Sequence, residues 1–321
     1  MTFSVREQPD SPRWLHWLAM LAVCATIPLL ALGAEVTTRK VGMADEIWPT
    51  YPWHLLLVSW TERGLGFLIE HSHRAAGYLL GCCVILLAIG LWRKDPRSWV
   101  RWLGIAALAG VIVQGLLGGF RVRLNELLGS DLALIHGSFS HLVFALLVSL
   151  AVLTSRSWTM AREETGLDLS QLRRWSLLTA CLVYLQLLLG AVVRHTPSSL
   201  GQRGHLLGAF AVVATAAWLA RTVYDLHIAD PALQRALKLM GLLLAVQLLL
   251  GIEAWLTKYA GGVLPDVQRL TTGQALVRTG HFLVGSTLFA TSVVVALRAH
   301  RQLVLNFRLA PSSVRQLEGV V

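Results

Sequence analysis

Eight apolar stretches, each long enough to cross a lipid bilayer as a helix, constrain the fold of this chain more than any other feature. They cover roughly residues 14–34, 66–92, 102–120, 132–154, 175–193, 204–223, 236–255 and 275–297. A transmembrane helix needs about 20 apolar residues, whereas a transmembrane strand needs only about ten that alternate with polar ones. The chain is 55% hydrophobic and 14% charged, against about 25% charged residues in soluble domains. The sequence therefore predicts an all-α integral membrane protein in a lipid bilayer.

The polar segment 155–174 divides the eight stretches into two groups of four. Most other connections are short, so consecutive helices should pack as antiparallel neighbours. We predict two pseudo-symmetric four-helix bundles, the first within residues 1–156 and the second within 175–300. A cytoplasmic linker at 157–174 would join them, and a cytoplasmic tail would follow at 301–321. Lys and Arg are more numerous at the helix ends that these assignments make cytoplasmic, which places both termini in the cytoplasm.

The formal charge of +10 does not indicate a nucleic-acid partner. The Lys and Arg residues are spread over the ends of the apolar stretches, as is usual in membrane proteins. The four cysteines all lie inside apolar stretches. We therefore expect no structural disulfide and no zinc site.

A short internal repeat runs through the chain. Gln-x-x-x-Gly occurs in the third, fifth and seventh stretches, at 114–118, 186–190 and 247–251. Each even-numbered stretch carries a histidine near the end at which it would enter the membrane from outside: His73, His136, His205 and His281. Gln-x-x-x-Gly is a weak signal alone, but three copies ahead of three histidines indicate a repeated helix pair.

Antiparallel alternation places these four histidines at a similar depth near the outer face, two in each bundle. A four-helix bundle with inward histidines on its second and fourth helices is suited to a haem held by two imidazoles. Arg121 and Arg194, at outer helix ends, could pair with the haem propionates. One such histidine alone is equally well explained by a hydrogen bond between helices. Zinc would need ligands that converge on one centre, whereas these divide between two halves.

The segment 67–78 places Glu70, His71, His73 and Arg74 in an otherwise apolar run. An ionisable group inside a membrane span is costly, so by default it is a functional hypothesis. Glu70 and His73 are three residues apart and share a helix face, whereas His71 points roughly to the opposite side. A carboxylate beside an imidazole can perform acid–base chemistry. For His71 we favour a supporting role, and we expect His54 at the membrane interface.

These residues resemble the haem A synthase family, eight-helix membrane enzymes that oxidise haem O to haem A. The similarity rests on Glu70-x-x-His73-Arg74, the segment 114–122, the segment 132–137 and the two later histidines, and it spans almost the whole chain. The first outer loop at 41–50 is also similar. Unlike many members of the family, this chain has no cysteine pair in that loop, so no thiol-dependent step is assigned to it.

The resemblance implies that the N-terminal bundle is the substrate side. Haem O would bind there through His73 and His136, with Arg74 and Arg121 as further binding residues. Glu70 would be the catalytic carboxylate. One porphyrin methyl group would be oxidised in steps to a formyl group, giving haem A for terminal oxidases.

The resemblance also implies that the C-terminal bundle holds a permanent haem b cofactor. His205 and His281 would be its iron ligands, as His73 and His136 would be for the substrate iron, and Arg194 would contribute to cofactor binding. Haem O synthase (protohaem farnesyltransferase) and the assembly of cytochrome oxidase are the implied partners. The implied location is the bacterial plasma (inner) membrane.

The main alternative is a di-haem cytochrome b-type membrane subunit that transfers electrons and modifies neither haem. It also needs two histidine pairs, but it has no need of Glu70 beside an iron ligand. A transporter built from internal repeats is a weaker alternative, because it does not explain four histidines at one depth.

Overall fold

The structure is a computed structural model that describes residues 11–45, 47, 54–60, 62–159, 168–228, 230–259 and 270–306. These residues form helices and connections, with no strand among them. Eight of the helices are long and apolar enough to cross a membrane. They are α1 (Arg13–Thr38), α3 (Leu65–Lys94), α4 (Ser98–Arg123), α5 (Asn125–Leu153), α7 (Ser170–His195), α8 (Ser199–Asp225), α9 (Pro231–Tyr259) and α10 (Thr272–Asn306). The predicted all-α, multi-pass membrane protein is thereby confirmed.

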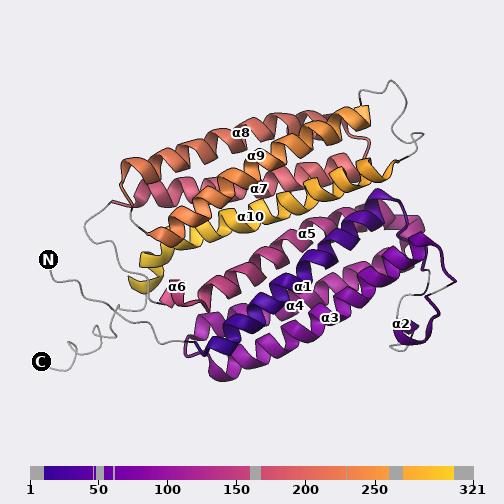
Figure 1. Ribbon diagram of the computed structural model, residues 1–321, viewed down its shortest axis with the longest axis horizontal. Helices are drawn as coiled ribbons and strands as arrows, with labels where there is room; N and C mark the ends of the chain where they lie inside the picture. The colour runs from indigo at the N-terminus through magenta and orange to yellow at the C-terminus, as the bar shows by residue number, and fades with distance from the viewer. Residues whose placement is uncertain are drawn as a thin grey trace, which may run out of the picture.

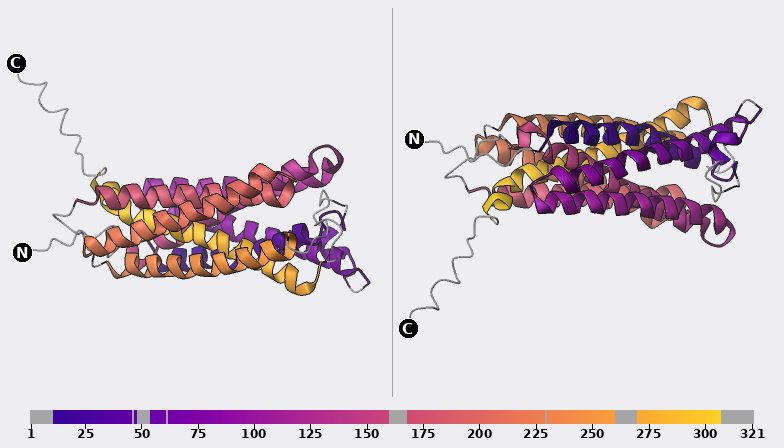
Figure 2. Two further views of the ribbon diagram at one scale, coloured as in Figure 1. Left: turned by 90° about the horizontal axis from the view of Figure 1, so that it is seen from above. Right: turned by 90° about the horizontal axis from the view of Figure 1, so that it is seen from below.

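The eight long helices form two bundles of four (Figure 1). Helices α1, α3, α4 and α5 pack together, as do α7, α8, α9 and α10, and helix α10 packs on α5 and α1 to join the bundles. The apolar core of the second bundle continues across this interface, where it includes Leu30 of α1 and Phe144 of α5. The helices of both bundles run roughly along the long axis of the molecule (Figures 1 and 2). This arrangement agrees with the predicted pair of four-helix bundles.

Two short helices complete the described chain: α2 (His54–Leu57) and α6 (Arg156–Thr159). Helix α1 begins at the end of the molecule where α10 finishes, and α2 lies at the opposite end (Figure 1). The end that carries α2 is called the outer end below, and the other is called the inner end. Which end faces the cytoplasm stays a prediction, as do the linker and tail boundaries, parts of which lie outside the described residues.

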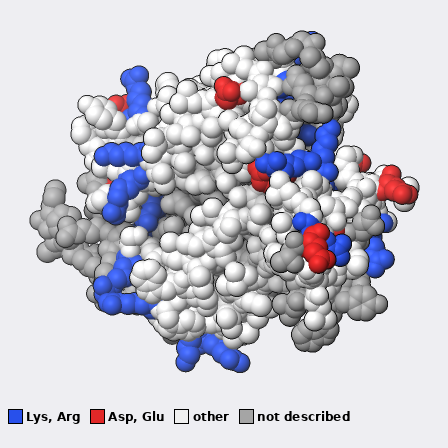
Figure 3. Space-filling view, turned by 45° about the vertical axis from the view of Figure 1, so that its right-hand side comes forward, with Lys and Arg blue, Asp and Glu red and all other residues white. Residues whose placement is uncertain are grey.

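The outward surfaces of the helices are apolar. Large side chains such as Trp17, Leu207, Phe210 and Leu249 are more than two-thirds exposed. In a soluble protein such a surface would be a liability, whereas lipid tails are its natural surroundings. On the face seen in Figure 3, most Lys and Arg side chains lie toward the two ends, and a broad band between them is uncharged.

The connection between α4 and α5 is shorter than the sequence suggests. The apolar stretches leave a gap at 121–131, but α4 ends at Arg123 and α5 begins at Asn125. The break is confined to Leu124 and to Leu128, which has a non-helical φ of −135°. Leucine and glutamate in this segment favour helix, so the helix continues beyond the apolar stretch and the chain reverses within a few residues.

A buried ion pair holds the inner end of the first bundle. Arg97, at 0% exposure, pairs with Asp95 at 2.7 Å. It also donates to the Leu153 carbonyl of α5 at 2.9 Å and to the Ser11 hydroxyl at 2.6 Å. Burial alone would raise the pKa of Asp95, but hydrogen bonds from Arg97 and Ser11 and the charge of Arg97 hold it below its usual value. The cluster fixes the α3–α4 turn against α5.

Candidate functional site

The structure brings the four predicted histidines together as two pairs. The rings of His73 (α3) and His136 (α5) lie 6.5 Å apart between centroids, at an interplanar angle of 82°. The rings of His205 (α8) and His281 (α10) lie 6.3 Å apart at 79°. Two imidazole nitrogens on opposite sides of one metal ion, each about 2 Å from it, put the ring centroids roughly 6 Å apart. Each bundle therefore holds one histidine pair with the spacing of a bis-histidine iron site.

The first histidine of each pair has a fixed ring orientation. His73 Nδ1 lies 3.0 Å from the Leu29 carbonyl oxygen, and His205 Nδ1 lies 3.1 Å from that of Gln186. A carbonyl partner makes Nδ1 the protonated nitrogen and leaves the lone pair on Nε2, the usual arrangement of a metal-binding histidine. In the second histidine of each pair, His136 and His281, Nδ1 is buried and has no hydrogen-bond partner among the described residues. Both observations fit imidazoles that ligate a metal.

The repeated glutamines contact these histidines from the preceding helix. Gln114 donates to the His136 carbonyl at 3.1 Å, Gln186 donates to the His205 carbonyl at 2.6 Å, and the amide nitrogen of Gln247 lies 3.4 Å from His281 Nε2. The repeat seen in the sequence is thus a repeated helix–helix contact.

The repeated glycines make room for the histidine rings. A Cβ added to Gly251 would lie 3.0 Å from His281 Cε1, one added to Gly190 would lie 3.1 Å from His205 Cε1, and one added to Gly118 would lie 3.6 Å from His136 Cε1. The fourth case is Gly33 of α1, where the distance to His73 Cε1 would be 2.8 Å. Sequence reasoning missed this copy because leucine, at position 29, replaces the glutamine of Gln-x-x-x-Gly.

Glu70 lies one turn before His73 on α3 and is 4% exposed. Its Oε1 accepts a hydrogen bond from Arg74 at 2.8 Å, and its Oε2 accepts one from the backbone N–H of Asp45 at 2.8 Å. Arg74 also pairs with the Asp45 carboxylate at 3.0 Å and donates to the carbonyls of Asp45 and Ile47. The loop after α1 is thereby tied to the first turns of α3, and the carboxylate of Glu70 is held in one orientation.

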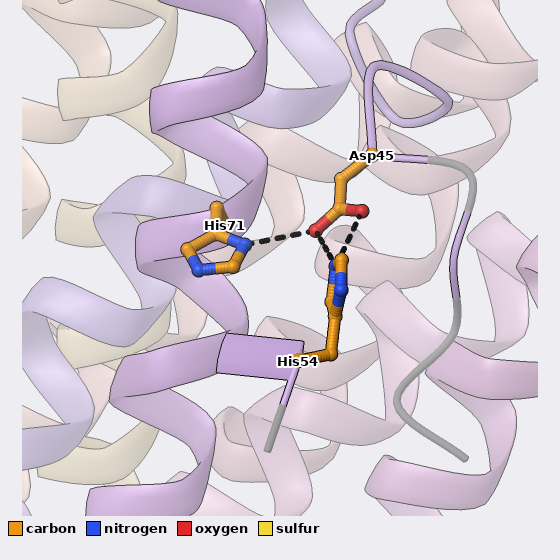
Figure 4. Close-up of side chains that lie close together, drawn as sticks. All are labelled: Asp45, His54 and His71. Carbon is orange, nitrogen blue, oxygen red and sulfur yellow. Dashed lines mark hydrogen bonds and ion pairs between the residues drawn. The ribbon is translucent and has the colours of Figure 1, made fainter. Parts of the chain in front are cut away.

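Asp45 is the functional candidate that the sequence did not reveal. It lies between His71 and His54 (Figure 4), with His71 Nδ1 2.9 Å and His54 Nε2 3.1 Å from its carboxylate oxygens. The loop after α1 folds over α3, so that the Asp45 carboxylate contacts His71 while its backbone N–H contacts Glu70. The supporting role expected of His71 stays a prediction. Burial alone would raise the pKa of Asp45, but the hydrogen bonds from His71 and His54 and the charge of Arg74 lower it below its usual value.

The arginines predicted to bind haem carboxylates differ in their contacts. Arg121 Nε is buried with no hydrogen-bond partner among the described residues, and a Cβ on Gly42 of the outer loop would collide with its guanidinium. Arg194 instead reaches α1, donating to the Ala34 carbonyl at 2.6 Å and to the Thr38 hydroxyl at 2.9 Å. Arg278, one turn before His281, also has a buried Nε without a partner among these residues. Arg121 and Arg278 therefore retain donors for an acidic ligand group.

The two bundles differ at the position three residues before the first histidine. This position holds Glu70 before His73 and the neutral Gln202 before His205. One carboxylate of the first bundle lies close to the His205–His281 pair. Glu35 of α1 accepts a hydrogen bond at 2.5 Å from Thr279, two residues before His281. Glu35 is also paired with Arg39 at 2.6 Å, so it is part of an ion pair at the end of α1.

The fold and these sites define an eight-span, two-bundle membrane protein with one histidine pair in each bundle. Residues 53–201 match the family model described as cytochrome oxidase assembly protein (COX15-CtaA). The curated relatives that the chain matches are named heme A synthases, in agreement with the resemblance seen in the motifs.

Three of these relatives illustrate the degree of similarity. The heme A synthase of Lysinibacillus sphaericus is 28% identical over 190 residues, which are 59% of this chain and 60% of the relative. That of Shouchella clausii is 31% identical over 192 residues, covering 59% and 62%. That of a Methylobacterium species is 30% identical over 164 residues, covering 47% and 43%. The matches with the first two thus span about 60% of the length of those relatives.

Proposed function

We propose that this protein is a haem A synthase, which oxidises one methyl group of haem O to a formyl group. The observation that carries the proposal is the contrast between two histidine pairs of nearly equal spacing, of which one has a buried carboxylate one turn away on the same helix. Two pairs of equal spacing suit two haems. A fixed acid beside one pair suits chemistry on the haem bound there.

The first bundle is the substrate side in this proposal. His73 and His136 hold the iron of haem O, and Arg121 pairs with a propionate through its Nε, which has no hydrogen-bond partner among the described residues. Oxidation of a methyl group with one water gives a formyl group, four protons and four electrons. Glu70 accepts protons near the reacting carbon, and Arg74 and the Asp45 backbone keep its carboxylate oriented. The electrons leave to an external one-electron oxidant.

The second bundle is the resident cofactor side. His205 and His281 would ligate the iron of haem b, Gly190 and Gly251 give the ligand rings their space, and Arg194, from the end of α7, is retained as a binding residue. Haem b supplies reversible one-electron transfer when bound. Gln202 offers no acid next to this pair, so a haem held there would keep its methyl groups.

The remaining parts of the proposal concern the cellular setting. The protein would lie in a bacterial plasma membrane with both termini in the cytoplasm. It would receive haem O from the farnesyltransferase that makes it and deliver haem A to the assembly of a cytochrome oxidase. The family match over residues 53–201 supports the link to oxidase assembly.

The test is to identify the haems that the protein carries. The protein is purified from cells that make haem O, and its haems are extracted and separated by chromatography. We expect haem b together with haem O, a hydroxylated intermediate or haem A. The His136→Ala variant should retain haem b and lose the others. Haem b alone, in both halves, would contradict the proposal and favour the di-haem electron-transfer subunit.

A further inference from the structure

Asp45, His54 and His71 form a compact cluster at the outer end of the first bundle. The cluster joins the loop after α1, the short helix α2 and helix α3 (Figure 4). One ligand atom from each residue can be chosen so that all three lie within 4.8 Å of one another. Asp45 and His71 are buried, at 3% and 0% exposure. The three side chains therefore converge, and the proposed haem chemistry assigns a role to none of these side chains.

The two distances from the histidines to Asp45 are close to the edges of a metal coordination shell. His71 Nδ1 lies 2.9 Å from Asp45 Oδ2, and His54 Nε2 lies 3.1 Å from Oδ1 and 3.4 Å from Oδ2. Two ligands bound tetrahedrally to one ion at about 2 Å lie roughly 3.3 Å from each other. An ion could thus enter with small side-chain movements and replace the hydrogen bonds between the ligands.

The chemistry of the ligands selects the class of ion. Two imidazoles and one carboxylate suit Zn²⁺ or a similar first-row transition metal, whereas Mg²⁺ and Ca²⁺ prefer oxygen ligands alone. Three protein ligands leave a position for water. This ion class departs from the expectation of no zinc site, which is drawn from the cysteines alone and does not consider a cluster of imidazoles and a carboxylate.

The surroundings hold the ligands in place. The His71 ring stacks on Phe67 with centroids 4.9 Å apart, and Trp60 meets it edge-on at 4.7 Å. Arg74 pairs with Asp45 at 3.0 Å, which favours the ionised carboxylate that a metal requires. The same positive charge opposes a nearby cation, so we expect binding of moderate strength.

We propose that Asp45, His54 and His71 form a binding site for one divalent transition-metal ion of the Zn²⁺ class. The ion would clip the loop after α1 and helix α2 onto α3. The backbone N–H of Asp45 holds Glu70 at 2.8 Å, so the clip would also steady that contact. The site stands independently of the identity of the haems.

The test uses the full-length protein purified with its haem, treated with a chelator and then dialysed against Co²⁺ or Zn²⁺. We expect one Co²⁺ per chain by elemental analysis, with the visible absorption of a four-coordinate Co²⁺ ion, and a rise in the unfolding temperature with Zn²⁺. The variants His54→Ala and Asp45→Asn should lose the Co²⁺ and the temperature shift. Their native haem spectrum would show that they are folded.

Two control variants separate this site from other histidines. His227→Ala changes a histidine at the inner end of α8 and should bind Co²⁺ as the unmodified protein does. His73→Ala removes a predicted haem ligand on the same helix and should also keep the Co²⁺. No Co²⁺ bound by the unmodified protein would overturn the proposal. Equal binding by the His54→Ala variant and the unmodified protein would overturn it as well.

Discussion

The two bundles share one way of placing their histidines and differ in what surrounds them. In both, the paired rings lie 6.3 to 6.5 Å apart, and each ring faces a glycine of the preceding membrane-spanning helix. Only the first bundle adds the buried Glu70, fixed by Arg74 and the loop after α1. The repeated helix pair therefore supplies the same histidine arrangement in both bundles, while a few residues at the outer end of α3 add a fixed carboxylate to one of them.

The same comparison extends to the inner ends. The first bundle is held there by the buried pair of Asp95 and Arg97. Near the inner end of the second bundle, Arg301 donates to the Trp158 carbonyl at 3.0 Å, and Arg221 and Asp225 of α8 form an exposed pair at 3.3 Å. The first bundle thus has a buried carboxylate in an ion pair at its inner end and another at its outer end, and two of the predictions below concern the inner pair.

The largest effect on stability is expected from Asp95→Asn. Removing one partner of a buried ion pair costs about 3–5 kcal/mol, because the other charge remains buried. Hydrogen exchange should become faster in α3 and α4 and change little in α7 to α10. Equally faster hydrogen exchange in both bundles would contradict the prediction that this ion pair stabilises the first bundle specifically.

Acid should act on the same half. The pKa of Asp95 is below its usual value in the folded protein. Its contribution to the free energy of unfolding is therefore fully present above the pKa of the unfolded state, about 3.9. As the pH falls below about 4, the unfolded state takes up the proton first and the contribution is lost. Thermal unfolding from pH 7 to pH 3 should show this loss, and the Asp95→Asn variant should lack that part of it.

The next largest effect concerns the proposed iron ligands. Substituting His281 by Ala should weaken retention of the resident haem by more than about a hundredfold, which is the upper end of the usual loss for residues that only support a metal ligand. His136→Ala should leave that haem in place and abolish binding of the substrate haem. The haem content of the two purified variants measures this directly. Loss of resident haem in both would break the assignment of one haem to each bundle.

Alanine at the repeated glycines should have graded effects. At Gly33 the new Cβ would lie 2.8 Å from His73 Cε1, whereas at Gly118 it would make an ordinary contact at 3.6 Å from His136. Overpacking of this kind costs about 1–3 kcal/mol, so Gly33→Ala should lower the thermal stability clearly and Gly118→Ala should not. The reverse order would show that the ring positions are not set by these contacts.

The smallest effect is expected at the repeated glutamines. Gln186→Leu removes a hydrogen bond of 2.6 Å to the His205 carbonyl, a loss of about 1 kcal/mol. Gln247→Leu removes only a long contact of 3.4 Å to His281 and should change the unfolding free energy less. Chemical denaturation in one detergent compares the two, and a larger loss at Gln247 would be the opposite of what these distances imply.

Much of the fold could be predicted because each membrane span is identified by the hydropathy of its own residues. The apolar runs predicted the eight long helices, and the histidines at equivalent helix positions predicted both histidine pairs. Gly33 escaped notice because a neighbouring leucine breaks the repeated pattern. The contacts of Asp45 and His54 could not be predicted because they depend on how the loop after α1 folds onto α3. His71, for example, contacts Asp45 across 26 residues of sequence. Helix periodicity carries no information on such a contact.

The most direct measurement is the ratio of haem A to resident haem b in the Glu70→Gln variant, produced in cells that make haem O. This substitution gives the first bundle the same residue type that the second bundle has at Gln202, and Gln202→Ala serves as the matched control. The account predicts unchanged haem b and a fall in haem A of about a hundredfold or more, as expected when a proton-transfer group is lost. A normal ratio in Glu70→Gln would contradict the catalytic role of Glu70 and, with it, the functional distinction between the two halves.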